Sequence, residues 1–307
     1  MKIKSVGLGT LLLLLFFSGL GAGAQEINTA LFQYDKLEPM LWKSEHLQDT
    51  ANCSISQASF VVTGDQVADV LIITKNDNTF TRKPVVIFQH WGGGDKSFFK
   101  QEAIAFAQKG FICVSMNAPW HWKTLDTASF FYTYPRFIRL SVIAIRRLID
   151  TLGRNRDIDR RNIYYIGHSY GATLGGLLAG IEPRIKGGIL MAGLPNISRF
   201  MIAEKQGVWK KNWDEDTARF MQVAKQLSEM EPENSIVNTK WKIYHQVAEK
   251  DEYVKSEQSD RFMNKTPKPF KSSSYQTGHL FNEEAMEDRI KWIMQLYQPG
   301  AFLSGMP

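Results

Sequence analysis

Short apolar runs alternate with amphipathic helical patterns along most of this 307-residue chain, from about residue 58 onward. A strand that is buried on both faces appears as a continuous apolar run, whereas a helix repeats its apolar residues every three or four positions. With 44% hydrophobic residues, the chain has enough apolar material for one large core. The alternation therefore predicts the α/β fold class, with a mostly parallel sheet flanked by helices.

The predicted elements follow one another in a regular order. Two early runs are expected to form an antiparallel pair. A long helix is expected to begin near Pro135 and to end at Gly153. The predicted strands lie at 58–64, 67–76, 83–90, 111–119, 162–166, 185–193, 240–248 and 271–276, and further helices at 97–110 and 282–297.

Residues 195–238 interrupt this order, because they separate two predicted strands by more than one crossover helix needs. The segment is rich in Lys, Glu, Met and Trp at helical spacing. It is interpreted as a helical cap insertion over the strand ends. The alternative is a set of surface helices with no role at a site.

The first 24 residues have the order of a secretory signal peptide. Two lysines precede an apolar run over 11–17, and small residues follow it. The alternative is an uncleaved membrane anchor, but the run is short for a bilayer span. The expectation is a signal peptide at 1–24, a mature domain at 25–307, no stable membrane insertion, and a secreted or periplasmic location.

The stretch GHSYGA at 167–172 lies between a predicted strand and a run of small apolar residues. G-x-S-x-G in this context is the nucleophile-elbow pattern. It holds the serine backbone in a sparsely populated conformation, and side chains at Gly167 or Gly171 would collide with the turn. The pattern favours Ser169 as a nucleophile, provided that catalytic partners exist. Otherwise the glycines only ease a tight turn.

With these motifs, the chain resembles the α/β-hydrolase superfamily over nearly all of the mature chain, with its dienelactone-hydrolase-like and small esterase branches as the nearest types. In that family the triad runs Ser, then Asp or Glu, then His. Only His245 and His279 follow Ser169 in the sequence. His245 lies inside a predicted strand, whereas His279 lies in the loop QTGHLF before the last helix. The resemblance therefore implies that His279 is the base.

The acid is expected in the loop AEKDEYVKSEQS, just after the strand at 240–248. Glu249, Asp251 and Glu252 are the candidates, unless the loop is only a solvated turn. Asp251 fits the family's habit of an aspartate two residues before a YV-like turn. The resemblance thus implies that Asp251 orients the imidazole of His279 and stabilises its cation.

Acyl transfer also needs N–H donors aimed at the developing oxyanion. The resemblance assigns one donor to the amide of Tyr170, directly after the nucleophile. The second donor is expected in the loop HWGGGDKS, where the family carries a His-Gly-rich segment. Because Trp91 replaces the usual first glycine, the donor is the amide of either Trp91 or Gly92. His90 is interpreted as a residue that braces this loop.

An aromatic loop follows the strand at 111–119. Loops at the carboxyl ends of such strands border active sites, so Trp120, His121 and Trp122 are candidates for the substrate pocket. Aromatic clusters are equally common as core material, and that alternative stays open.

Other chemistries have little support in the sequence. The formal charge is +6, and +4 without the two lysines of the leader, and the basic stretch at 154–161 is interrupted by two aspartates, so no nucleic-acid partner is indicated. Asp95 stands where a P-loop needs glycine, and no His-Glu-x-x-His stretch occurs, so neither a cofactor nor a metal is expected. Cys53 and Cys113 either form a disulfide or remain two buried thiols.

These observations together predict a serine hydrolase that cleaves carboxylic esters, on a small-molecule or carbohydrate substrate, through an acyl-enzyme. A peptidase of the same fold is the nearer alternative. A catalytically silent binding protein is the more distant one.

Overall fold

The computed structural model describes residues 27–77, 81–122 and 130–297. In this part of the chain nine strands form one sheet, in the order β1-β2-β3-β5-β4-β6-β7-β8-β9. The strands β1, β2, β3 and β5 pair in antiparallel fashion, and all other pairs are parallel, which confirms the predicted α/β class. The strands are β1 (Lys43–Thr50), β2 (Cys53–Thr63), β3 (Gln66–Lys75), β4 (Lys83–Gln89), β5 (Ile112–Met116), β6 (Ile158–His168), β7 (Gly187–Met191), β8 (Lys242–Ala248) and β9 (Lys271–Tyr275).

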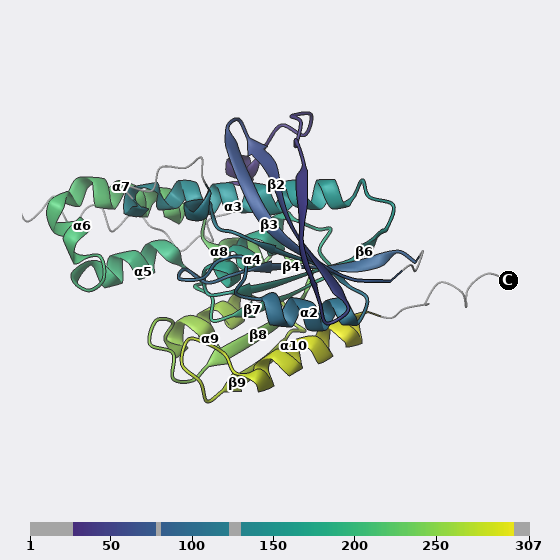
Figure 1. Ribbon diagram of the computed structural model, residues 1–307. Helices are drawn as coiled ribbons and strands as arrows, with labels where there is room; N and C mark the ends of the chain where they lie inside the picture. Colours follow the sequence, from purple (N-terminus) through teal and green to yellow (C-terminus); the bar gives the residue numbers. More distant parts are fainter. Residues whose placement is uncertain (1–26, 78–80, 123–129, 298–307) are drawn as a thin grey trace, which may run out of the picture.

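Helices cover both faces of the sheet (Figure 1). Strand β4 illustrates why, because its side chains alternate between the two faces. Val85 and Ile87 join the core on the side of α3 (Phe130–Leu152) and α4 (Tyr170–Ile181). Val86 and Phe88 join the core on the side of α2 (Lys100–Gln108) and α10 (Glu283–Leu296). The other elements outside residues 195–238 are α9 (Ser256–Lys265) and the short 3-10 helices η1 (Thr29–Phe32) and η2 (Pro119–His121).

Two elements differ from the sequence prediction. The long helix α3 includes Phe130, five residues before the expected start at Pro135. The ring of Phe131 packs 5.0 Å from the rings of Trp209 and Phe220, and this packing extends the helix past a residue that disfavours it. Strand β1 was not predicted, because almost every residue of this edge strand is exposed and no apolar alternation marks it.

Residues 195–238 contain α5 (Ile197–Ala203), η3 (Glu204–Gln206), α6 (Lys210–Glu215), α7 (Thr217–Ser228) and α8 (Pro232–Ile236). Figure 1 places α5, α6 and α7 together at one side of the sheet. Phe220, Leu227 and Ile236 are fully buried and belong to the same core as α3 and α4. The insertion is therefore packed against the main body as part of its core.

Two acidic residues near the end of this insertion bind neighbouring segments, one at the start of the insertion and one in α9. Glu231 accepts hydrogen bonds from the backbone N–H groups of Ile197 (2.5 Å) and Ser198 (3.0 Å), at the start of α5. Glu233 forms a bidentate ion pair with Arg261 of α9, with distances of 2.5 and 2.7 Å. Burial, with a smaller contribution from the Glu233 carboxylate, raises the pKa of Glu231 to about 7.

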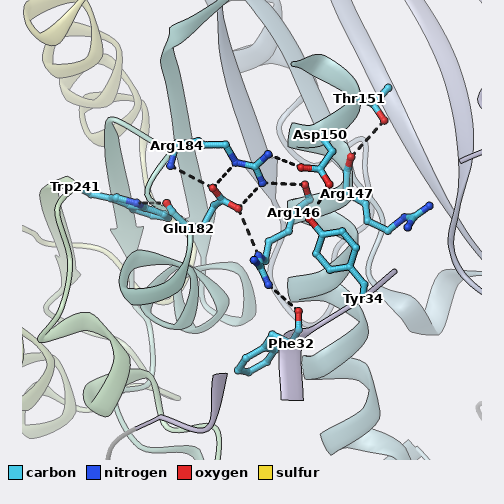
Figure 2. A network of polar contacts seen from close by, with 9 residues as sticks. All are labelled: Phe32, Tyr34, Arg146, Arg147, Asp150, Thr151, Glu182, Arg184 and Trp241. Carbon is cyan, nitrogen blue, oxygen red and sulfur yellow. Dashed lines mark hydrogen bonds and ion pairs between the residues drawn. The ribbon is translucent and has the colours of Figure 1, made fainter. Parts of the chain in front are cut away.

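A polar network ties the C-terminal end of α3 to the residues that directly follow α4 (Figure 2). The almost fully buried Glu182 accepts two hydrogen bonds of 2.6 Å from Arg184, which also pairs with Asp150. Tyr34 donates to Asp150 at 2.7 Å, so the network also fixes the N-terminal segment. The indole of Trp241 donates to the carbonyl oxygen of Glu182 at 2.8 Å.

We expect the stability of the protein to fall as the pH rises, in part because of Glu231. Its pKa in the folded protein, about 7, lies above the value of 4.5 for a free glutamate side chain. The stability that comes from its bound proton is therefore fully present below pH 4.5 and is lost as the pH rises through 7. This loss amounts to about 3 kcal/mol.

Urea unfolding at several pH values between 4.5 and 8 measures this loss. The variant Glu231→Gln carries no titrating proton at this position, so its free energy of unfolding should fall less over the same range. An equal fall in both proteins would contradict the assignment.

Candidate active site

Ser169 lies at the junction between β6 and α4 in a strained backbone conformation. Its φ of 52° and ψ of −103° place it in a region that residues other than glycine rarely occupy. Such a conformation costs about 1–3 kcal/mol and persists only where the surroundings enforce it. The backbone N–H of Ser169 donates to the carbonyl oxygen of Met191 at 2.7 Å, which fixes the turn to the end of β7. The half-buried side chain hydroxyl makes no hydrogen bond within the described residues.

The two glycines of the motif are required by close backbone contacts. A β-carbon on Gly167 would lie 2.4 Å from the backbone of Gly171, and one on Gly171 would lie 2.1 Å from the carbonyl oxygen of Gln89. Both distances are far below a normal contact. The strand β4, the strand β6 and the helix α4 can meet at this point only with glycine in both positions.

His279 and Asp251 form a buried pair. The Nδ1 atom of His279 lies 3.0 and 2.9 Å from the two carboxylate oxygens of Asp251. The backbone N–H groups of Tyr253 and Val254 also donate to Asp251, at 2.8 and 2.9 Å. Burial raises the pKa of Asp251, but the hydrogen bonds from His279 and from the two amides outweigh it, so the pKa lies below its usual value. An ionised Asp251 keeps the proton of His279 on Nδ1 and leaves Nε2 free to accept one.

The residue before Ser169 contacts His279. His168 directly precedes Ser169, and its Nε2 atom lies 2.8 Å from the carbonyl oxygen of His279. The rings of His168 and His279 are 4.9 Å apart. No direct hydrogen bond joins the side chains of Ser169 and His279 in the described part of the chain.

The other candidate acids lie outside the pair. Glu249 is exposed, and its carboxylate accepts a hydrogen bond from the side chain of Gln276. Glu252 accepts from the backbone N–H of His279 at 3.2 Å and makes no contact with its ring nitrogens. Of the three acids predicted from the sequence, only Asp251 reaches the imidazole.

The backbone amides of Tyr170, Trp91 and Gly92 are free to bind an anion. Within the described residues none of the three donates to a protein acceptor. Tyr170 is the first residue of α4, where the N-terminal end of the helix favours negative charge. Both alternatives for the second donor, Trp91 and Gly92, therefore stay open.

The glycine loop that carries Trp91 and Gly92 is braced by histidines. His90 is fully buried, with its Nδ1 atom 2.6 Å from the carbonyl oxygen of Trp91 and its Nε2 atom accepting from the backbone N–H of Ala118. Burial lowers the pKa of His90 to about 4, so the ring is neutral. His121 lies 2.9 Å from the carbonyl oxygen of Gly94. The bracing role predicted for His90 is confirmed.

The indole of Trp91 folds back over its own loop. A β-carbon on Gly93 would lie 2.5 Å from this ring, and one on Gly94 would lie 3.0 Å from it. The ring is also 6.0 Å from the ring of His279. The run of glycines thus makes room for an aromatic side chain beside the imidazole.

The three pocket candidates have different environments. Trp122 is only 3% exposed, belongs to the hydrophobic core and donates to the carbonyl oxygen of Asn117 at 3.1 Å. This environment favours the alternative that Trp122 is core material. Trp120 is partly exposed and packs 4.7 Å from the ring of Tyr170, and His121 is exposed. Trp120 and His121 remain candidates.

Around His279, sequence reasoning missed His168 and Tyr253, and it considered Glu252 only as a candidate acid. His168 and Glu252 bind its backbone, and the half-exposed ring of Tyr253 lies 4.9 Å from its imidazole. The only available signal was position, because His168 adjoins the predicted nucleophile and the other two follow the predicted acid.

Other features of the described residues bear on cofactors and on the cysteines. They contain no group of three or more His, Cys, Asp or Glu side chains that could hold a metal ion. Among them, no helix is long and apolar enough to cross a bilayer. Cys53 and Cys113 are both buried and free, which answers the question left open by the sequence. The leader predicted at 1–24 lies outside the described residues.

Comparisons with known proteins agree with this architecture. The acetyl xylan esterase 1 from Thermoanaerobacterium sp. JW/SL YS485 has a TM-score of 0.74 at 14% identity, over 88% of this chain and 92% of its own. The acetyl xylan esterase from Paenibacillus sp. R4 has a TM-score of 0.74 at 16% identity, over the same shares. The acylaminoacyl peptidase from Pyrococcus horikoshii has a TM-score of 0.58 at 16% identity, over 85% of this chain and 41% of its own. At these identities the likeness shows the fold alone.

A search of curated protein sequences finds no match. The sequence profile of the alpha/beta hydrolase fold matches residues 83–306. The chain therefore belongs to the alpha/beta hydrolase fold family, as the motif order predicted.

We expect Gly171→Ala to destabilise the protein strongly, by about 3 kcal/mol or more, because its methyl group would overlap the carbonyl oxygen of Gln89. Gly92→Ala is the matched control, since a β-carbon there meets nothing within 4 Å. Thermal and urea unfolding of both variants measure the difference. Equal stabilities would show that the backbone relaxes at the elbow.

Proposed function

We propose that this protein is a serine hydrolase that cleaves carboxylic esters through Ser169, His279 and Asp251. One set of observations carries the proposal. Ser169 has a strained backbone, and its hydroxyl has no hydrogen-bond partner within the described residues. It directly follows His168, whose ring lies 4.9 Å from that of His279, and the Nδ1 atom of His279 is held by the carboxylate of Asp251. The esterase and peptidase structures of the same fold support a hydrolase.

The geometry supports a two-step acyl transfer. His279 Nε2 accepts the proton of Ser169 as the hydroxyl oxygen attacks the ester carbonyl carbon. The resulting oxyanion accepts hydrogen bonds from the amide of Tyr170 and from that of Trp91 or Gly92. The imidazolium then gives its proton to the departing alkoxide, which leaves as the alcohol. Water repeats the sequence on the acyl-enzyme and releases the acid.

Asp251 has an electrostatic role in this scheme. It keeps the Nδ1 proton in place and stabilises the imidazolium without taking the proton itself. Its low pKa suits this role, because the carboxylate stays ionised well below neutral pH.

The surroundings of the site favour a small acyl group. The ring of Trp91 lies 6.0 Å from that of His279, and the ring of Trp120 lies 4.7 Å from that of Tyr170. In the proposed site these aromatic side chains would narrow the space for the acyl group and offer flat surfaces for a sugar-like alcohol. We propose short-chain esters as substrates, with acylated carbohydrates among them. The insertion at 195–238 would act as a cap.

We further infer a secreted or periplasmic enzyme from the basic, apolar and small-residue order of the first 24 residues. The mature chain would then begin near Gln25.

A peptidase is the second candidate, because a peptidase of the same fold is among the similar structures. A silent binding protein is the more distant alternative. It is disfavoured by the presence of every residue that the proposed triad needs.

We expect Ser169→Ala to abolish hydrolysis and labelling by a fluorophosphonate probe, because the nucleophile is gone. Asp251→Asn should lower kcat by about 10²–10⁴-fold, since it disturbs the tautomer of His279. Glu249→Gln is the control and should keep wild-type activity, because its carboxylate binds only Gln276. Labelling of the Ser169→Ala variant would refute the assignment of the nucleophile. Wild-type kcat in Asp251→Asn together with a large loss of kcat in Glu249→Gln would refute the assignment of the acid.

Ester hydrolysis should exceed amide hydrolysis, with short acyl chains preferred. An alkoxide leaves readily, whereas an amine must be protonated as it departs and peptidases commonly add groups that grip the peptide. Turnover of acetyl, butyryl and octanoyl nitrophenyl esters, compared with aminoacyl nitroanilides, tests this expectation. Faster cleavage of a nitroanilide than of any ester would favour the peptidase.

A further inference from the structure

Both backbone polar groups of His279 are bound by side chains from other parts of the chain. Its N–H donates to Glu252 Oε2 at 3.2 Å, and its carbonyl oxygen accepts from His168 Nε2 at 2.8 Å. The ring is held separately by Asp251. The histidine is therefore fixed at three points, although it lies in a loop between β9 and α10.

The ring of His168 lies in largely apolar surroundings and makes one hydrogen bond, from Nε2. The side chain is fully buried, stacks on Phe98 with 5.5 Å between ring centroids, and meets the edge of Phe281 at 5.7 Å. Its Nδ1 atom has no partner. An apolar side chain would fill this space without leaving a buried polar atom unpaired. Within the described residues, the bond from Nε2 to the His279 carbonyl is thus the one polar contact that the His168 ring makes.

The charge state of His168 fits this reading. Burial, together with the neighbouring His279 ring, lowers the pKa of His168 to about 3, so the ring is neutral at physiological pH. A neutral imidazole carries one proton, and the contact with a carbonyl oxygen places that proton on Nε2. His168 therefore adds no positive charge beside the proposed base.

Glu252 holds the opposite side of the same residue. It adjoins Asp251 in sequence, so one short loop supplies both the acid for the ring and the acceptor for the backbone N–H. Its side chain is exposed, which makes it accessible to substitution without opening the core.

We propose that His168 and Glu252 are positioning residues that clamp the backbone of His279 and so keep its imidazole in line with Ser169. This inference rests on the proposed function. His168 is the covalent neighbour of the nucleophile, so its bond ties the elbow directly to the histidine loop. A displacement of about 1 Å in such a group can lower the rate by about 100-fold.

The test compares two variants of similar size. His168→Met removes the donor, and His168→Gln keeps an N–H group at the same distance along the side chain. We expect His168→Met to lower kcat and the rate of fluorophosphonate labelling by about 10- to 100-fold with little change in KM. His168→Gln should recover most of this loss. Equal losses of kcat in both variants would show that the rate depends on the packing of His168 and not on its hydrogen bond, which would overturn the clamp.

A second comparison separates positioning from general damage. In the His279→Ala background, His168→Met should cost almost nothing more, because residues that act as a unit are not additive. A further large loss there would overturn the clamp. Wild-type rates in His168→Met would overturn it as well.

If His168→Met does not fold, variants of Glu252 test the clamp instead. Glu252→Ala should slow labelling by about 3- to 10-fold, and Glu252→Gln, which keeps an acceptor, should restore part of the rate. No effect of Glu252→Ala would then overturn the clamp. If the wild-type protein is not labelled at Ser169, the proposed function and the clamp are both refuted. If the wild type is labelled and active, the results with the variants bear on the clamp alone.

Discussion

The arrangement of the site depends on one close backbone contact, between Gly171 in the first turn of α4 and the carbonyl oxygen of Gln89 at the end of β4. A β-carbon on Gly171 would lie only 2.1 Å from that oxygen, so the helix can start here only because the side chain is absent. The contact brings the start of α4 against the loop that follows β4. Ser169, two residues before Gly171, has a positive φ at this same turn.

Three of the buried histidines in this part of the molecule are neutral, namely His90, His168 and His245. Burial lowers the pKa of His90 to about 4 and that of His245 to about 3, and His168 is likewise neutral. Each of these rings acts through hydrogen bonds alone, as His245 does toward Thr266 at 2.8 Å. The ionised Asp251 is therefore the charge that contacts the ring of His279, which is the arrangement that stabilises a transient imidazolium.

The sequence was informative wherever chemistry or periodicity left a local pattern. The succession of strands and helices and the elbow glycines follow from such patterns, and the resemblance to the hydrolase family implied the pairing of His279 with Asp251. Strand β1 carries none, because its residues are exposed. The start of α3 was misplaced because aromatic packing around Phe131 overrides the local effect of Pro135. The contact of His168 with His279 spans 111 residues, so no local pattern could reveal it.

The insertion at 195–238 shares its core with the rest of the molecule, and this bears on how the site obtains its shape. Phe220 of α7 stacks on Phe131 of α3 with 5.0 Å between ring centroids, and it is fully buried. Trp120 packs in turn on Phe130 and Phe137 of the same helix. Helix α3 thus contacts the insertion through Phe131, and it contacts Trp120, which packs against Tyr170, through Phe130 and Phe137. Because close-packed interiors transmit strain, a substitution at Phe220 in α7 is expected to displace α3 and, with it, Trp120.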